Sequence, residues 1–180
     1  MNHSVQHPDA VAAATTSSKI RDAGVLKPMS KSVAEILGLP PVDQVAWLVH
    51  DIDKALLSFE PIFGAFTRME SEIQGSIFRG KKTDMKLDIA FGKSGELEIE
   101  LIAVLKGDGP HREFLDSRGE GVHHIRFRVE DIAEPRRKLE DLGFKAIWEH
   151  GMPEMNIHWA YFEAPQDQGG AVVELLQMPG

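Results

Sequence analysis

Four polar residues stand at matched points of the sequence and could together bind a divalent metal ion. Gln44 and His124 are separated by 80 positions (124 − 44), and Glu100 and Glu174 each interrupt an aliphatic run. A carboxylate inside an apolar strand is costly unless it is paired or bound to a cation. Three oxygen donors and one imidazole suit Zn²⁺, Ni²⁺, Co²⁺ or Mn²⁺ and leave coordination positions open for a substrate.

Each of these residues also has an ordinary explanation when taken alone. A glutamate in a strand usually lies on the solvated face of an antiparallel sheet. His124 on its own could be a core histidine beside His123 whose ring nitrogens are hydrogen-bonded within the protein. The matched placement of two pairs in two halves of the chain is what favours a metal site.

The chemistry of such a site would be proton transfer next to a carbonyl group. A divalent ion that binds a carbonyl and a neighbouring oxygen stabilises the enolate formed when the adjacent carbon loses a proton. Glu174 and Glu100 are the candidates for the base and the acid, and one of them can leave the metal to act.

Strand alternation predicts which side chains contact the substrate. Arg126 lies two positions after His124, faces the same way, and could grip a carboxylate or phosphate, although pairing with Glu98 is an open alternative. Leu48 occupies an equivalent strand in the first half and predicts an apolar wall. His158 is a candidate for the rim, with an ordinary strand-end histidine as the alternative. We therefore expect a small-molecule substrate that carries an anionic group.

An internal repeat positions these residues. Residues 44–52 align with 124–132, with apolar residues at the same places and an identical Asp-Ile at the end. A helical pattern ending in glycine follows each segment, and the aliphatic run 97–102 resembles 172–176. The repeat predicts an α+β fold in which two βαβββ modules form a cup-shaped mixed sheet.

The domain organisation follows from this repeat. Residues 1–39 are expected to be a flexible leader (1–29) and a short helix that Pro40 ends. The first module is expected over 42–105 and the second over 120–178, with a linker over 106–119 that holds a short helical run.

Composition excludes several classes of function. The chain has 180 residues, no cysteine and a formal net charge of −8, so it offers neither thiolate ligands nor the basic surface that nucleic-acid binding needs. No run approaches the roughly 20 apolar residues of a membrane span, and no signal peptide is evident. We expect a cytoplasmic protein with no membrane partner.

Residues 118–125, which read Arg-Gly-Glu-Gly-Val-His-His-Ile, resemble a segment of the methylmalonyl-CoA epimerases. These belong to the vicinal-oxygen-chelate superfamily, with glyoxalase I, extradiol dioxygenases and bleomycin-resistance proteins. The resemblance covers about 42–178 and implies that His124 binds metal, with Glu100 and Glu174 at the second and fourth ligand positions. The resulting Gln–Glu–His–Glu set is similar to that of glyoxalase I, which implies Glu174 as the base.

Two positions depart from the epimerases. They usually carry histidine where Gln44 stands, and they often have a Glu-Gln-Gly after the first helix, with that glutamate proposed as a proton carrier. Here the chain reads Glu72-Ile73-Gln74-Gly75, so the glutamate lies one place away. The resemblance thus implies an isomerase, epimerase or lyase acting on an activated carbonyl compound, which could be a CoA thioester, a glutathione adduct or a keto or hydroxy acid.

Two other functions are alternatives. A ring-cleaving iron dioxygenase usually needs two histidines and one carboxylate, and Gln44 counts against it. A metal-free ligand-binding protein of the bleomycin-resistance type would leave two strand carboxylates unexplained. Whichever function holds, we expect a homodimer.

Overall fold

The computed structural model describes residues 35, 37–166 and 170–179. The chain divides into two units, Met1–Ser30 and Lys31–Gly180, and the second unit carries the fold. The expected leader over 1–29 lies outside the described residues. Of the helix expected over 30–39, only Glu35 and Leu37 are described as helical.

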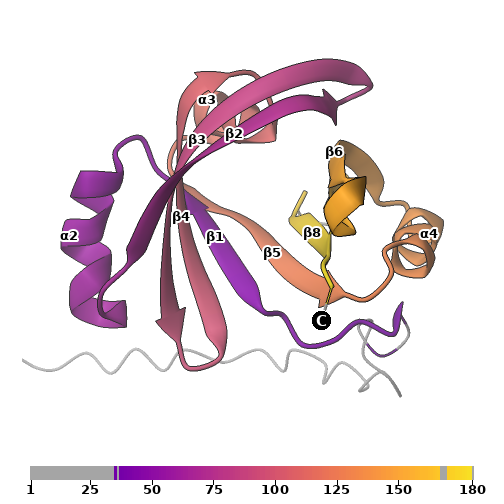
Figure 1. Cartoon of the computed structure of the whole chain (residues 1–180), viewed down its shortest axis with the longest axis horizontal. Coiled ribbons are helices and arrows are strands. Elements are labelled where there is room, and N and C mark those ends of the chain that lie inside the picture. The colour runs from indigo at the N-terminus through magenta and orange to yellow at the C-terminus, as the bar shows by residue number, and fades with distance from the viewer. Residues whose placement is uncertain (1–34, 36, 167–169, 180) are drawn as a thin grey trace, which may run out of the picture. The chain divides into compact units, whose positions relative to one another are not determined.

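The second unit contains the same succession of elements twice (Figure 1). The first module consists of β1 (Gln44–Leu48), α2 (Ile52–Phe63), β2 (Thr67–Phe78), β3 (Lys81–Ser94) and β4 (Leu97–Gly107). The second consists of β5 (Gly121–Val129), α4 (Ala133–Asp141), β6 (Lys145–Met152), the 3₁₀ turn η1 (Pro153–Met155), β7 (Ile157–Glu163) and β8 (Val172–Gln177). Between them lies α3 (Pro110–Arg118), where the sequence indicates a short helical run. The α+β fold of two βαβββ modules is confirmed, whereas the module boundaries stay predictions.

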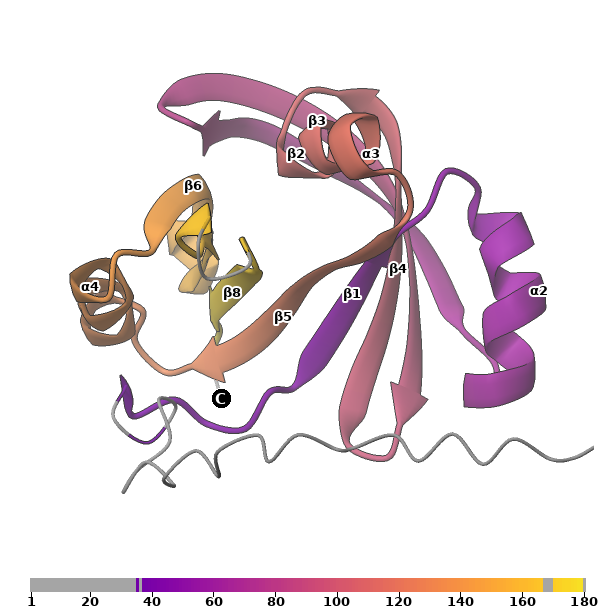
Figure 2. The ribbon, with the colours of Figure 1, turned by 180° about the vertical axis from the view of Figure 1, so that it is seen from behind.

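The strands form one curved mixed sheet in the order β1-β4-β3-β2-β6-β7-β8-β5, which closes on itself because β5 also pairs with β1. The two modules are joined differently at their two borders. β1 and β5 pair along their length, whereas β2 and β6 pair only through Ile77 with Glu149 and Phe78 with Trp148. We call this second, two-pair border the seam; Figure 2 shows the same arrangement from behind.

The pairing register repeats between the modules. In the parallel pair β1–β4, Ala46 lies opposite Glu100, and in the parallel pair β5–β8, Arg126 lies opposite Glu174. Strand pairing therefore brings the two glutamates to equivalent places on either side of the β1–β5 border.

Helices cover the sheet where its outward residues are apolar. Asp51 caps α2 by accepting a hydrogen bond from the Lys54 amide at 3.1 Å, and Gly64 ends the helix with a φ of 82°. On the other module, Leu37 packs into the cluster that contains Ile132 and Leu139 beside α4.

No helix among the described residues is long and apolar enough to cross a membrane.

Candidate functional site

A cavity of about 370 Å³ is lined by side chains from both modules. Its polar lining residues include Gln44, Glu100 and Glu174. Its apolar walls include Phe91 on β3 and Trp159 on β7. The cavity therefore combines a small cluster of donors with a mostly aromatic and aliphatic surround, which is typical of small-molecule sites.

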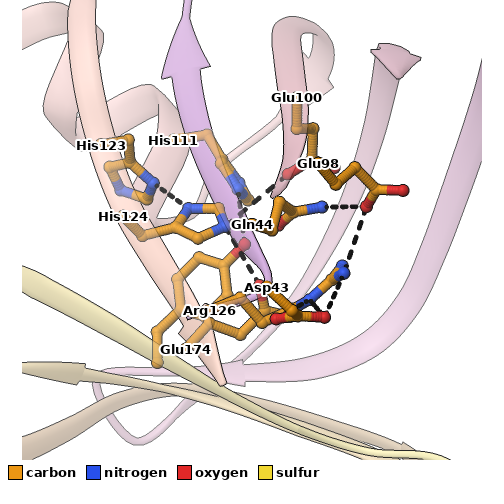
Figure 3. Close-up of polar contacts among 10 residues, drawn as sticks. Asp43, Gln44, Glu98, Glu100, His111, His123, His124, Arg126 and Glu174 are labelled. Atoms are coloured by element: carbon orange, nitrogen blue, oxygen red, sulfur yellow. Dashed lines mark hydrogen bonds and ion pairs between the residues drawn. The ribbon is translucent and has the colours of Figure 1, made fainter. Parts of the chain in front are cut away.

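Three of the four predicted metal ligands, Gln44, Glu100 and Glu174, line this cavity, and His124 lies against the two glutamates, each of the four residues on a different strand. Their exposed fractions are 0% for Gln44 (β1), 7% for Glu100 (β4), 1% for His124 (β5) and 7% for Glu174 (β8). Nε2 of His124 lies 3.0 Å from Oε2 of Glu174 and 3.6 Å from Oε2 of Glu100. Figure 3 shows the carboxyl groups and the amide gathered around this nitrogen.

The donor set fits a divalent metal ion. Nε2 of His124 and Oε1 of Gln44 are buried and make no hydrogen bond, and buried polar atoms of this kind usually have a partner. Within residues 35, 37–166 and 170–179, no three His, Asp or Glu side chains stand ready as a metal site. The amide oxygen of Gln44 adds a fourth donor beside Glu100, His124 and Glu174, and one imidazole with three oxygens suits Zn²⁺, Co²⁺, Ni²⁺ or Mn²⁺.

The electrostatics of the two carboxyl groups also call for a cation. Burial raises the pKa of Glu100 well above its usual value, and the nearby charge of Glu174 raises it further. A bound divalent ion would oppose both effects, since it favours the charged carboxylate.

A hydrogen bond joins His124 to the neighbouring His123. Nδ1 of His123 lies 2.9 Å from Nδ1 of His124, and both rings are buried. Burial, and then the charge of His124, lowers the pKa of His123 well below its usual value, so this ring is neutral. Only one of the two Nδ1 atoms can carry the shared proton. If it is that of His124, the Nε2 of His124 is left with a free lone pair facing the two carboxyl groups.

Sequence reasoning missed two buried residues beside the quartet. The Tyr161 ring centroid lies 4.7 Å from that of His124, and the Tyr161 hydroxyl lies 3.2 Å from Nε2 of His111. Burial, with the charges of the two glutamates, raises the pKa of Tyr161, while burial lowers the pKa of His111 to about 3. The sequence does carry one signal for the first of them: Tyr161 is the only tyrosine of the chain and alternates with Trp159 on β7.

Of the three predicted substrate contacts, Arg126, Leu48 and His158, only Arg126 lines the cavity in the described part of the chain. Arg126 lines the cavity, but its guanidinium is paired with Asp43 and Glu98, which is the alternative that the sequence left open. Leu48 is fully buried in the core, and neither it nor His158 lines this cavity in the described part of the chain. Along β7 the cavity is reached instead by residues 157, 159 and 161, which alternate with His158.

The strand that departs from the epimerase pattern presents an apolar side chain to the cavity. Ile73 on β2 lines it, whereas Glu72 is exposed beside Gln74. Among the described residues, the carboxyl groups that line the cavity are therefore those of Glu100 and Glu174.

Comparison with known proteins agrees with this architecture. The chain is 28% identical over 140 residues to Bacillus subtilis YqjC (77% of this chain and 93% of that protein). It is 26% identical over 165 residues to the human mitochondrial methylmalonyl-CoA epimerase (88% and 85%), and 27% identical over 145 residues to the ethylmalonyl-CoA/methylmalonyl-CoA epimerase of Cereibacter sphaeroides (76% and 97%).

Solved structures share the fold. The methylmalonyl-CoA epimerase of Mycobacterium tuberculosis matches with a TM-score of 0.56 at 23% identity, over 79% of this chain and 90% of that one. A Streptomyces coelicolor methylmalonyl-CoA epimerase in complex with 2-nitronate-propionyl-CoA matches with a TM-score of 0.59 at 22% identity, over 79% and 96%. The family model of the Glyoxalase/Bleomycin resistance protein/Dioxygenase superfamily matches residues 43–177. The chain, with its two βαβββ modules and its shared central cavity, belongs to this superfamily.

Proposed function

We propose that the protein is a metal-dependent isomerase, epimerase or lyase that moves a proton next to the carbonyl group of a small substrate. The observation that carries this proposal is the meeting of two buried carboxyl groups, Glu100 and Glu174, at one unpartnered imidazole nitrogen of His124. The epimerase relatives support the same class of reaction.

Gln44, Glu100, His124 and Glu174 would hold the ion through Oε1, the two carboxylates and Nε2. When bound, a divalent ion polarises a carbonyl group and stabilises the negative charge that develops on its oxygen. The chain's own residues then decide which proton moves and in which direction.

Glu174 is the proposed base, and Glu100 the acid that can return a proton. The two carboxyl groups come from equivalent positions of the two modules, so a substrate lying between them has one on each side. Once the Glu100 carboxyl leaves the ion, burial raises its pKa, and a raised pKa suits a residue that must carry a proton near neutral pH.

The cavity walls support a small acyl group as the part of the substrate that enters. Phe91, Trp159 and Ile89 offer apolar surface, and their contact with the substrate would keep water from the reacting carbon. A CoA thioester of a branched acid is the first compound to test, because the relatives are named for such substrates. The homodimer and the cytoplasmic location stay predictions.

The test combines metal binding with proton exchange. Protein purified without chelator is titrated with Co²⁺ and then incubated in D₂O with methylmalonyl-CoA or with the hemithioacetal of methylglyoxal and a thiol. We expect deuterium to enter the carbon next to the carbonyl group of at least one compound. Loss of the corresponding signal in the proton NMR spectrum measures this exchange. Glu174→Gln should slow this exchange by about 100-fold or more, because it removes the base.

Glu72→Gln is the matched control, since Glu72 is an exposed strand glutamate outside the cavity. It should exchange at the parent rate. A protein that binds no divalent ion and exchanges no proton would contradict the proposal. An exchange rate unchanged in Glu174→Gln would contradict the role of that residue.

A further inference from the structure

Gln44 differs from the other three candidate ligands because its side chain can present either of two opposite groups. The amide oxygen coordinates cations, whereas the NH₂ group of the same side chain only donates hydrogen bonds. The two groups have nearly the same shape, so packing alone does not choose between them. Something must therefore fix which one faces Glu100, His124 and Glu174.

The structure supplies that choice through Glu98. Nε2 of Gln44 donates a hydrogen bond to Oε1 of Glu98 at 2.8 Å, and Oε1 of Gln44 is left buried without a partner (Figure 3). Turning the amide over would place its oxygen against the Glu98 carboxylate. It would also turn the NH₂ group toward the side from which the oxygen would bind a cation. Both changes are repulsive.

Glu98 is itself held in place by Arg126. Nη2 of Arg126 donates to the same Oε1 of Glu98 at 3.1 Å and to Oδ2 of Asp43 at 2.8 Å. Burial alone would lower the pKa of Arg126, but the hydrogen bond to Asp43 and the charges of Glu174, Asp43 and Glu98 raise it, so the guanidinium stays charged.

Strand pairing builds this row of side chains. Gln44 on β1 lies opposite Glu98 on β4 and opposite Arg126 on β5, so the three residues are neighbours across adjacent strands. The Arg126 side chain is only 15% exposed. A charged row this enclosed is held in one arrangement by its own partners.

The second module provides an internal comparison. There the ligand is His124, and the residue opposite it on β8 is Val172, which stands where Glu98 stands in the first module. An imidazole receives its orientation from its own second nitrogen, through His123, and has no amide to orient. A glutamate therefore stands opposite the amide ligand, and a valine stands opposite the imidazole ligand.

From these contacts we infer that Glu98, held in place by Arg126, is a positioning residue that aims the carbonyl oxygen of Gln44 at the metal ion. Arg126 holds Glu98 through Nη2, and its Nε and Nη2 also donate to Asp43. The inference rests on the proposed function, because it assumes that the quartet binds a divalent ion.

The test is a double-mutant cycle on Co²⁺ affinity, measured by calorimetric titration and by the visible absorption of bound Co²⁺. Glu98→Val, which copies the second module, is made in the parent and in Gln44→Met, whose side chain has a similar length but no amide to orient. Loss of the Glu98 charge weakens Co²⁺ binding similarly in both backgrounds. The difference between the two losses of affinity therefore measures how much the orientation of the Gln44 amide contributes. We expect the loss to be about 10-fold or more larger in the parent, with a shifted Co²⁺ spectrum there.

Two further variants separate orientation from charge. Asp43→Asn removes a negative charge that pairs with the Arg126 guanidinium, but it keeps the hydrogen bond between Gln44 and Glu98. The Co²⁺ affinity of this variant should therefore stay within about 3-fold of the parent. Glu98→Gln keeps an acceptor oxygen for Gln44 and should recover most of the affinity that Glu98→Val loses. If Glu98→Val fails to fold, Glu98→Ala, which also lacks the acceptor, takes its place.

Equal losses in the two backgrounds would overturn the inference, as would a loss in Asp43→Asn as large as that in Glu98→Val. In both of these cases the parent still binds Co²⁺, so the proposed function stands. A parent protein that binds no Co²⁺ would instead overturn the proposed function, and the two failures are thereby distinguished.

Discussion

The buried rings of His123 and His124 share one proton, and its position bears on the proposed metal site. Nδ1 of each ring faces the other at 2.9 Å, so the proton lies on one of them. With the proton on Nδ1 of His124, its Nε2 offers a lone pair to the cluster, and His123 is the acceptor that stabilises this tautomer.

Replacing His123 should therefore weaken metal binding without removing a ligand. We expect His123→Phe to lower Co²⁺ affinity by about 10- to 100-fold, because His124 loses the acceptor for its Nδ1 proton. Calorimetric titration measures the effect, and His150→Phe, at a half-buried ring tilted against that of Trp159, is the control. An affinity equal to that of the control would show that the histidine pair does not act on the metal.

A second prediction at this scale concerns the neutral state of His111. Burial lowers its pKa from 6.5 to about 3. Below pH 6.5 the unfolded chain binds this proton and the folded protein does not, so the free energy of unfolding falls as the pH falls. Over about 1.5 pH units below 6.5, the parent should lose about 2 kcal/mol more stability than His111→Phe. Urea unfolding at pH 6.5 and at about pH 5 measures the loss of unfolding free energy in the parent and in His111→Phe. Equal losses in the two proteins would contradict the prediction.

The sequence predicts four candidate ligands, whose metal binding stays a prediction, and it does not predict the residues that surround them. Gln44, Glu100, His124 and Glu174 can be found because duplication repeats their positions, and the structure gathers them at one cavity. The choice between substrate contact and pairing for Arg126 depends on strand register, which the sequence does not state.

At the scale of elements, the repeat predicts the order of strands and helices, but the irregularities of the strands come from tertiary contacts. The β3–β4 pairing shifts register between Lys86 and Leu87, and β4 ends at Gly107 opposite Met85. Gly107 has a φ of 93°, and a Cβ there would lie 2.0 Å from the Asp84 carbonyl oxygen. The hydrophobic pattern of the sequence cannot predict such a contact, because the contact involves only backbone atoms.

Gly107→Ala should consequently destabilise the protein by about 3 kcal/mol, through an unfavourable φ and a clash with backbone that cannot move aside. Gly95→Ala is the matched control. Gly95 also has a positive φ, of 63°, but a Cβ there meets nothing within 4 Å, so its cost should be about 1 kcal/mol. Urea unfolding compares the two variants, and equal costs would exclude the clash as the cause.

At the scale of the whole second unit, the cup expected from the sequence is a closed barrel. The closure depends on the two pairs of the seam and on Arg79, whose amide donates to the Ile147 carbonyl at 2.8 Å. The Arg79 guanidinium also pairs with Glu113 on α3 and with Glu163 at the end of β7. These contacts join distant parts of the chain, which is why a local repeat predicts the two modules but not their closure.

Removing the guanidinium should loosen this border and leave the fold intact. We expect Arg79→Met to speed amide hydrogen exchange at Ile77 and Phe78, while global stability changes by less than about 1 kcal/mol, because exposed ion pairs contribute little. Lys86→Met removes another ion pair of the same hairpin, that with Glu70, and is the control. Exchange at Ile77 and Phe78 that matches the control would show that Arg79 does not hold the seam.

The origin of the ligands, two from each module, has a mechanical consequence. A metal ion held by Gln44 and Glu100 on one side and by His124 and Glu174 on the other would act as a cross-link between the first and last strands of the fold. In a chain without cysteine, it would do for the native state what a disulfide does in a secreted protein. Chelation of such an ion would remove a structural clamp together with the catalytic centre.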